Sequence, residues 1–172
     1  MSEKTPRRAG RPRRKPMVAK PAAASAPIVA KPAPEAPPPA ERRLLARVPI
    51  SVRWRDLDAF NHVNNSTFLT YLEEARLSWL SQIRGPWFAE TYTPLLANTD
   101  VNYRLPINWP GQIVVELYCE RLGNSSLTLA HRIVDAKLRD VLYSDGKSVM
   151  VWVEPVSGKS IPLPAAIREA CE

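Results

Sequence analysis

One long stretch with helical periodicity, flanked by segments with strand periodicity, constrains the fold of this chain most. Between Ser66 and Ile83, apolar side chains recur in steps of three and four residues, which is typical of one buried helix face. These side chains are Phe68, Leu72, Ala75, Trp79 and Ile83. Asn65 or Ser66 is suited to cap the start of this helix, and Gly85-Pro86 should end it.

The segments around this helix have the properties of strands. From Val48 to Trp54, apolar and polar residues alternate, as in a half-buried strand. Later segments with strand character are Leu95–Tyr103, Ile113–Leu122, Leu127–Ala136 and Val141–Val153. We interpret Asp145-Gly146 as a bulge within one long strand, since a hairpin there would leave a very short first strand. A short helix, Ala165–Ala170, should end the chain.

The order of these elements determines the expected fold class. Strands and helices do not alternate along the chain, which argues against a parallel, doubly wound sheet. The sequence therefore predicts an α+β fold in which an antiparallel sheet wraps around one long central helix. This domain should comprise residues 45–172, because the composition changes near residue 44.

Residues 1–44 differ from the rest of the chain in composition. They hold 10 of the 18 prolines and no aromatic residue, so they cannot bury enough apolar surface to fold, and we expect a disordered tail. They also hold 11 Lys and Arg against 3 Glu, whereas residues 45–172 hold 13 against 14 acidic residues. This basic tail could contact nucleic acid or another anionic surface by charge alone, but without aromatic residues base stacking has no support.

Several classes of protein are excluded by what the sequence lacks. Its apolar runs are far shorter than the roughly 20 residues needed to cross a membrane, and no apolar segment follows the basic N-terminus as in a signal peptide. Two cysteines, Cys119 and Cys171, and two histidines, His62 and His131, have no usual zinc-site spacing. We therefore expect a cytoplasmic protein without a structural metal.

One loop concentrates the polar residues that could carry chemistry. Asp56–Asn65 joins the first strand to the long helix and contains two carboxylates, one histidine and three asparagines. A carboxylate beside a helix N-terminus pairs a base or nucleophile with N–H groups that can stabilise an oxyanion, as acyl transfer requires. Alternatively, Asp56 and Asp58 form Asx turns and Asn64 or Asn65 caps the helix, with no chemistry.

The stretch from Val52 to Arg76, VRWRDLDAFNHVNNSTFLTYLEEAR, resembles the hot-dog-fold acyl-CoA thioesterases of the 4-hydroxybenzoyl-CoA thioesterase-like superfamily. Those enzymes share the pattern of a strand, Asp-x-Asp, His-Val-Asn-Asn and a helix with Glu-x-Ala-Arg character. The resemblance extends from about Leu45 to the C-terminus and excludes the tail. It implies a hot-dog fold with acyl-CoA thioester hydrolysis.

The resemblance also implies roles for single residues. Asp58 matches the catalytic carboxylate, which acts as general base or nucleophile, and Asp56 matches a structural carboxylate. The backbone N–H of Asn65 matches the group that points at the thioester carbonyl. His62 and Asn64 would support the loop.

Two further positions need comment. Asn61 stands where the family usually has Gly, and Asn tolerates the left-handed backbone that this turn needs. Some relatives use a glutamate on the helix, so Glu73 and Glu74 remain minor catalytic candidates.

The same resemblance implies the partners and the assembly. The substrate would be acyl-CoA, or an acyl group on acyl carrier protein, with no metal or bound cofactor. The chain would form a homo-dimer or tetramer with sites at the subunit interface, and outward-facing apolar residues in Ile113–Ala136 favour a covering subunit. The alternative function is a non-catalytic module that binds acyl-CoA or acyl carrier protein.

Overall fold

A computed structural model describes residues 42–172, which form one antiparallel sheet, one long helix and two short helical segments. The sheet has the strand order β1-β3-β4-β5-β2, and every neighbouring pair is antiparallel. Its strands are β1 (Arg43–Ser51), β2 (Thr93–Tyr103), β3 (Gln112–Leu122), β4 (Ser126–Asp135) and β5 (Leu142–Val153). The helical segments are η1 (Trp54–Asp56), α1 (Asn65–Leu80) and α2 (Ala165–Cys171).

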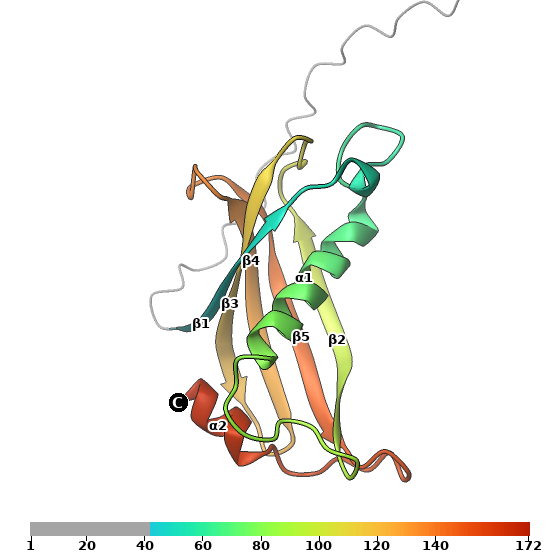
Figure 1. The fold of residues 1–172 in the computed structure, drawn as a ribbon, viewed down its shortest axis with the longest axis vertical. Coiled ribbons are helices and arrows are strands. Elements are labelled where there is room, and N and C mark those ends of the chain that lie inside the picture. Colours follow the sequence, from blue (N-terminus) through green and yellow to red (C-terminus); the bar gives the residue numbers. More distant parts are fainter. Residues whose placement is uncertain (1–41) are drawn as a thin grey trace, which may run out of the picture. The chain divides into compact units, whose positions relative to one another are not determined.

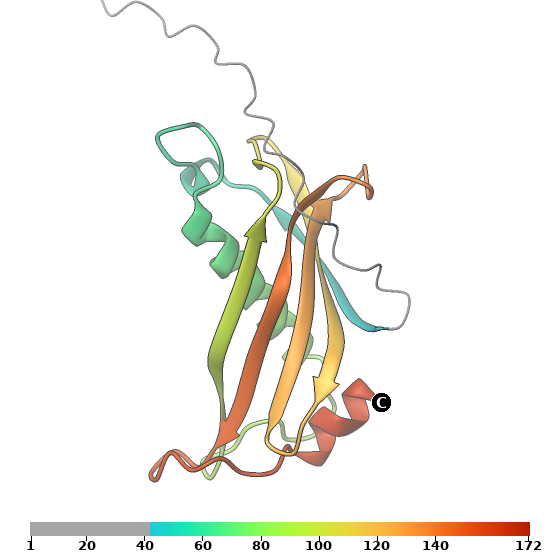
Figure 2. The same ribbon diagram turned by 180° about the vertical axis from the view of Figure 1, so that it is seen from behind.

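Helix α1 lies across one face of the sheet, as Figure 1 shows, and the opposite face is seen from behind in Figure 2. The core lies between α1 and the inner face of the sheet, with side chains such as Leu72 of α1, Leu117 of β3 and Trp152 of β5 fully buried. This arrangement confirms the expected antiparallel sheet wrapped around one long helix. Within residues 42–172, no helix is long and apolar enough to cross a membrane.

The helix α1 is shorter than the sequence predicts. Its N-cap is Asn64, whose side chain accepts a hydrogen bond from the Ser66 N–H, so the expected cap at Asn65 or Ser66 was wrong by one or two residues. The helix ends at Leu80, whereas Ile83 was expected in its last turn. Gly85, in the left-handed region with φ of 100°, follows five residues later, and Ile83 still packs against the core from the connecting loop.

Three other details differ from the expectations. Trp54 lies in η1 with 72% of its surface exposed, so the first strand ends before it. The strand β5 is continuous through Asp145-Gly146, as expected, but its irregular pairing with β4 falls at Tyr143. β1 begins at Arg43, so two residues that we assigned to the tail lie in the sheet. The expected disorder of the tail falls on residues 1–41, outside the described part.

Candidate active site

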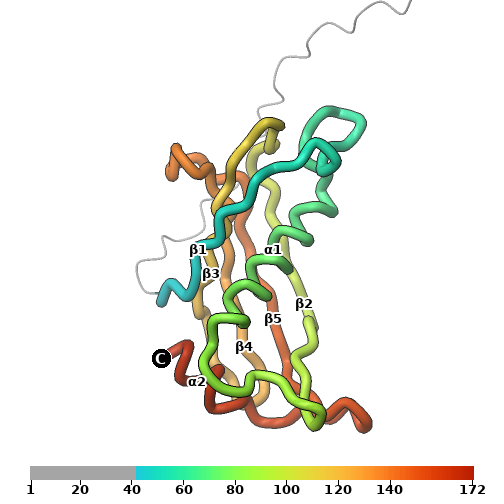
Figure 3. Tube along the Cα trace, viewed as in Figure 1, coloured from blue at the N-terminus to red at the C-terminus, as the bar shows by residue number. Residues whose placement is uncertain are grey.

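The loop between η1 and α1 is closed at its base by backbone hydrogen bonds. Leu57 and Val63 form an antiparallel bridge, and the Asn64 N–H donates to the Asp56 carbonyl at 2.8 Å. The Asp58 N–H donates to the His62 carbonyl, also at 2.8 Å. The loop therefore runs out and back as a tight hairpin at the N-terminal end of α1, as the tube in Figure 3 shows.

Asp56 is buried and fully engaged in hydrogen bonds. Its Oδ2 accepts from the Arg53 backbone N–H at 2.8 Å and from the Tyr71 hydroxyl at 2.7 Å, and Arg53 Nε contacts both carboxylate oxygens at 3.2 Å. Burial by itself raises the pKa of Asp56, but these donors outweigh burial and hold the pKa below its usual value. Both oxygens are thus used to tie η1 to α1, which is a structural task.

Asp58 keeps one carboxylate oxygen free. Its Oδ1 accepts hydrogen bonds from the Phe60 N–H at 2.8 Å and, more weakly, from the His62 N–H at 3.4 Å. Among residues 42–172, no donor contacts Oδ2. The loop backbone thus fixes the direction of the carboxylate while leaving one oxygen available to a water molecule or a substrate.

Asn65 is the first residue of α1, and its N–H is free. The cap residue Asn64 satisfies the next two N–H groups: its Oδ1 accepts from Ser66 at 2.9 Å and its carbonyl from Thr67 at 2.8 Å. In the described part of the chain the Asn65 N–H has no acceptor. A free N–H at the positive end of a helix is suited to bind a carbonyl oxygen that gains negative charge.

The turn of this loop uses the left-handed conformation that the sequence suggested. Asn61 has φ of 63°, and its N–H donates to the Asp58 carbonyl at 3.1 Å. His62 is exposed and enters the loop through its backbone, since its imidazole forms no hydrogen bond or ion pair among residues 42–172. The structure therefore brings together Asp56, Asp58, Asn61, His62, Asn64 and Asn65.

Glu73 and Glu74 lie apart from this group. Both side chains are exposed on α1, two turns beyond its first residue, and neither takes part in a hydrogen bond or ion pair among residues 42–172. Their assignment as minor candidates stays a prediction.

Two tyrosines that contact the loop were missed by sequence analysis. Tyr71 donates to Asp56, and the Tyr103 hydroxyl donates to the Asn65 carbonyl at 3.0 Å. Tyr71 lies on the buried side of α1, so the helical period could have placed it in the core but not against a carboxylate. Tyr103 is the last residue of β2, far from the loop in sequence.

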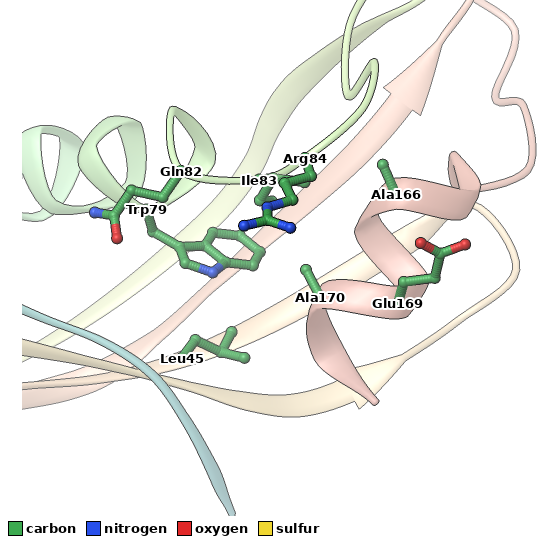
Figure 4. A pocket seen from close by; sticks show the side chains of 8 residues that line it. All are labelled: Leu45, Trp79, Gln82, Ile83, Arg84, Ala166, Glu169 and Ala170. Atoms are coloured by element: carbon green, nitrogen blue, oxygen red, sulfur yellow. The ribbon is translucent and has the colours of Figure 1, made fainter.

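A cleft of about 380 Å³ lies at the other end of α1 and contains none of these residues. Figure 4 shows its lining residues, which include Leu45 of β1, Trp79 of α1, Arg84 of the following segment and Glu169 of α2. This cleft and the candidate site are therefore separate features of the described part of the chain.

An antiparallel sheet around one long helix, with Asp-x-Asp in the loop that precedes the helix, defines a hot-dog protein of the thioesterase class. Residues 52–171 match the model of the Thioesterase-like superfamily, and the chain belongs to this family.

Individual relatives agree with this assignment. The chain is 26% identical over 125 residues to the long-chain acyl-CoA thioesterase FadM of Escherichia coli, covering 72% of this chain and 94% of that protein. A candidate acyl-CoA thioesterase from Xanthomonas campestris is 54% identical, covering 64% of this chain and 93% of that one, with a TM-score of 0.61. A thioesterase from Thermus thermophilus, solved with coenzyme A and zinc, is 36% identical with a TM-score of 0.63, covering 74% and 92%. The expected fold and enzyme class, a hot-dog thioester hydrolase, are confirmed.

Proposed function

We propose that this protein hydrolyses acyl-CoA thioesters and that Asp58 is the catalytic carboxylate. The observation that carries the assignment of Asp58 is the contrast between two carboxylates in one loop. Both oxygens of Asp56 accept hydrogen bonds, whereas Oδ2 of Asp58 has no donor among residues 42–172. The names of the relatives, and the coenzyme A bound by one of them, support acyl-CoA as the substrate.

The reaction breaks the C–S bond of the thioester, releases coenzyme A as its thiol and leaves the free acid. Asp58 either takes a proton from the attacking water or attacks the carbonyl itself, giving an anhydride that water then hydrolyses. In both routes the carbonyl oxygen gains negative charge. The Asn65 N–H, at the positive end of α1, stabilises this charge.

The active unit in this proposal is a homo-oligomer. Strand β2 is an edge strand whose only partner in the described sheet is β5, and its Leu95 and Leu96 are each 51% exposed. Leu69 and Leu77 are exposed on α1. An open edge and exposed leucines are both features that a second copy would cover.

Part of the face expected to carry this interface is already buried in the single chain. On the outer side of the sheet, Tyr118 and Glu116 are buried, and the Tyr118 hydroxyl donates to the Glu116 carboxylate at 2.8 Å. Arg47 and Arg132 also pair with Glu116, at 3.0 and 3.3 Å. The support for an oligomer therefore comes from β2 and α1 rather than from the region Ile113–Ala136.

The decisive experiment compares variants in the release of thiol from a panel of acyl-CoA thioesters. Asp58→Asn should lower turnover by about 10²-fold or more while the protein stays folded, because it removes the base or nucleophile. Asp140→Asn is the matched control, since Asp140 is exposed and its side chain forms no hydrogen bond or ion pair among residues 42–172. Full activity in folded Asp58→Asn would refute the assignment of Asp58 as the catalytic carboxylate. A loss of activity in Glu73→Gln or Glu74→Gln would indicate instead that a glutamate of α1 is the catalytic carboxylate.

Two further outcomes separate the alternatives. Binding of acyl-CoA or acylated carrier protein without thiol release would indicate a binding module instead of an enzyme. Label found in the Asp58 carboxylate after a single turnover in ¹⁸O-labelled water would establish the anhydride route, with water attacking the Asp58 carbonyl carbon and the unlabelled Asp58 oxygen leaving with the product acid. The acyl carrier protein, the cytoplasmic location and nucleic-acid contact by the tail stay predictions.

A further inference from the structure

Tyr103 connects the open edge of the sheet to the first residue of α1. Its hydroxyl donates a 3.0 Å hydrogen bond to the Asn65 carbonyl, and its ring meets Phe68 edge-on, with centroids 5.0 Å apart and planes at 84°. We propose that Tyr103 is a positioning residue for the reaction, which holds the first residue of α1 so that the Asn65 N–H points at the thioester oxygen. This inference rests on the proposed role of the Asn65 N–H.

In the first turn of α1, the cap contacts come from the loop, and Tyr103 adds a hydrogen bond from the end of β2. Asn64 holds Ser66 and Thr67 from the loop side, and its own N–H is held by Asp56. The carbonyl of Asn65 extends to the side of β2, where Tyr103 holds it. The peptide groups of a helix end fray unless they are bound, and a donor stabilises an oxyanion only when its direction is fixed beforehand.

The exposure of Tyr103 indicates that its hydroxyl orients Asn65 more than it stabilises the folded protein. The side chain is 47% exposed, so its hydroxyl could bond to water equally well if the Asn65 carbonyl were absent. Its ring contact with Phe68, which is buried, anchors the side chain to the core. Removal of the hydroxyl should therefore disturb the orientation of Asn65, and with it the direction of its N–H, more than the folding equilibrium.

Tyr103→Phe tests this role because it removes the hydroxyl and keeps the ring. Tyr92→Phe is the control, since the Tyr92 hydroxyl also donates to a backbone carbonyl, that of Pro86, at 3.1 Å, away from the loop. In acyl-CoA hydrolysis we expect Tyr103→Phe to lower kcat by about 10-fold with KM and melting temperature close to wild type. Tyr92→Phe should change none of these values.

The outcomes separate this inference from the proposed function. Wild-type kcat in Tyr103→Phe, while Asp58→Asn loses its activity, overturns the positioning role alone. A fall in kcat that comes with a raised KM and a lowered melting temperature also overturns it, because the contact would then be structural. Undiminished turnover in Asp58→Asn overturns the proposed function instead.

A measurement without substrate tests the positioning role of Tyr103 even if the protein does not hydrolyse the acyl-CoA thioesters that are tried. Amide relaxation and exchange, measured by NMR on the full chain, should show greater mobility of Asn65 and Ser66 in Tyr103→Phe than in Tyr92→Phe. Equal mobility in the two variants would overturn the positioning role.

Discussion

The hydroxyl of Tyr71 and the carboxylate of Asp56 form a buried hydrogen bond of 2.7 Å that joins the middle of α1 to the start of the site loop. Burial and the neighbouring carboxylate both raise the pKa of Tyr71, so the phenol stays protonated and donates. The Asp56 carbonyl in turn accepts from Asn64, which caps α1. The two carboxylates of the loop thus differ: that of Asp56 holds the loop to the helix, and that of Asp58 has one oxygen without a donor among residues 42–172.

Asp56→Asn should therefore destabilise the protein more than it impairs chemistry. The amide cannot accept from Arg53 and Tyr71 as the carboxylate does, and we expect a loss of about 2 kcal/mol in the free energy of unfolding. Because the pKa of Asp56 is lowered in the folded state, its contribution is complete above the ordinary aspartate pKa and is lost as the pH falls through the folded-state value. Urea denaturation at pH 7, with Asp140→Asn as the control, measures this loss, and equal stability of the two variants would contradict it.

Asn61 should be replaceable by glycine but not by alanine. Its φ of 63° lies in the left-handed region, which glycine adopts freely and alanine only at a cost of about 1 kcal/mol. Asn61→Gly should keep the melting temperature and turnover near wild type, whereas Asn61→Ala should lower both, because the turn sets the position of Asp58. Thermal unfolding and thiol release compare the pair, and indistinguishable variants would show that the turn does not hold Asp58.

Stability should fall at mildly acidic pH because of His131. Burial, assisted by the charge of Arg76 and opposed by that of Asp145, lowers its pKa to about 4. Between the ordinary histidine pKa of about 6.5 and this value, the unfolded chain takes up a proton that the folded chain does not, so the free energy of unfolding decreases as the pH falls, by up to about 3 kcal/mol. Below this range the effect levels off.

The two histidines of the chain provide a matched pair for this prediction. Denaturation should show that the free energy of unfolding is much lower at pH 4.5 than at pH 7, both in the wild type and in His62→Gln, whose imidazole is exposed. In His131→Gln the difference between the two pH values should shrink, even if that variant is less stable at both. If His131→Gln loses as much stability between pH 7 and pH 4.5 as the wild type does, His131 is not the cause of the loss of stability at acidic pH.

Removal of residues 1–41 should leave the melting temperature and turnover nearly unchanged, because a segment of this composition buries little apolar surface. The truncation should end at residue 41, because Arg42 pairs with Glu120 at 3.3 Å and β1 begins at Arg43. Removal through Ala46 is the contrasting truncation and should lower the melting temperature. A large effect of the shorter truncation would mean that the tail contributes to the folded domain.

The assembly can be measured by light scattering on the full chain and on residues 42–172. We expect the mass of a dimer or tetramer at micromolar concentration. Leu77→Lys, on the exposed side of α1, should lower both mass and activity, whereas Leu138→Lys, in the loop between β4 and β5, should change neither. A monomer whose activity is unchanged on dilution would refute the interface site.

The sequence by itself determined the elements and the position of the site. Periodic apolar residues are a local property of the chain, so they indicated the single long helix and the strands, and the order of these elements indicated the antiparallel class. The motif around Asp58 and His62 located the loop, and the substitution of Asn61 for glycine indicated its left-handed turn. Each of these features depends on residues that are neighbours in the chain.

Element ends were less predictable, because tertiary contacts decide them. Asn64 and Asn65 are equally good caps by residue type, and only the bond from Ser66 shows which one is used. Ile83 continues the helical period, yet it packs against the core from a loop beyond the end of α1.

Only the tertiary structure decided which side chains form hydrogen bonds with the residues of the candidate site. Tyr71 is 15 residues from Asp56, and Tyr103 is 38 residues from Asn65, so no local pattern could pair them. Likewise, Arg47 and Arg132 cover the outer face around Glu116 from two different strands. Such contacts depend on the strand order and register, which bring residues together that are distant in the sequence. A sequence pattern indicates which side of an element each residue faces, but it does not identify the residue that it contacts on that side.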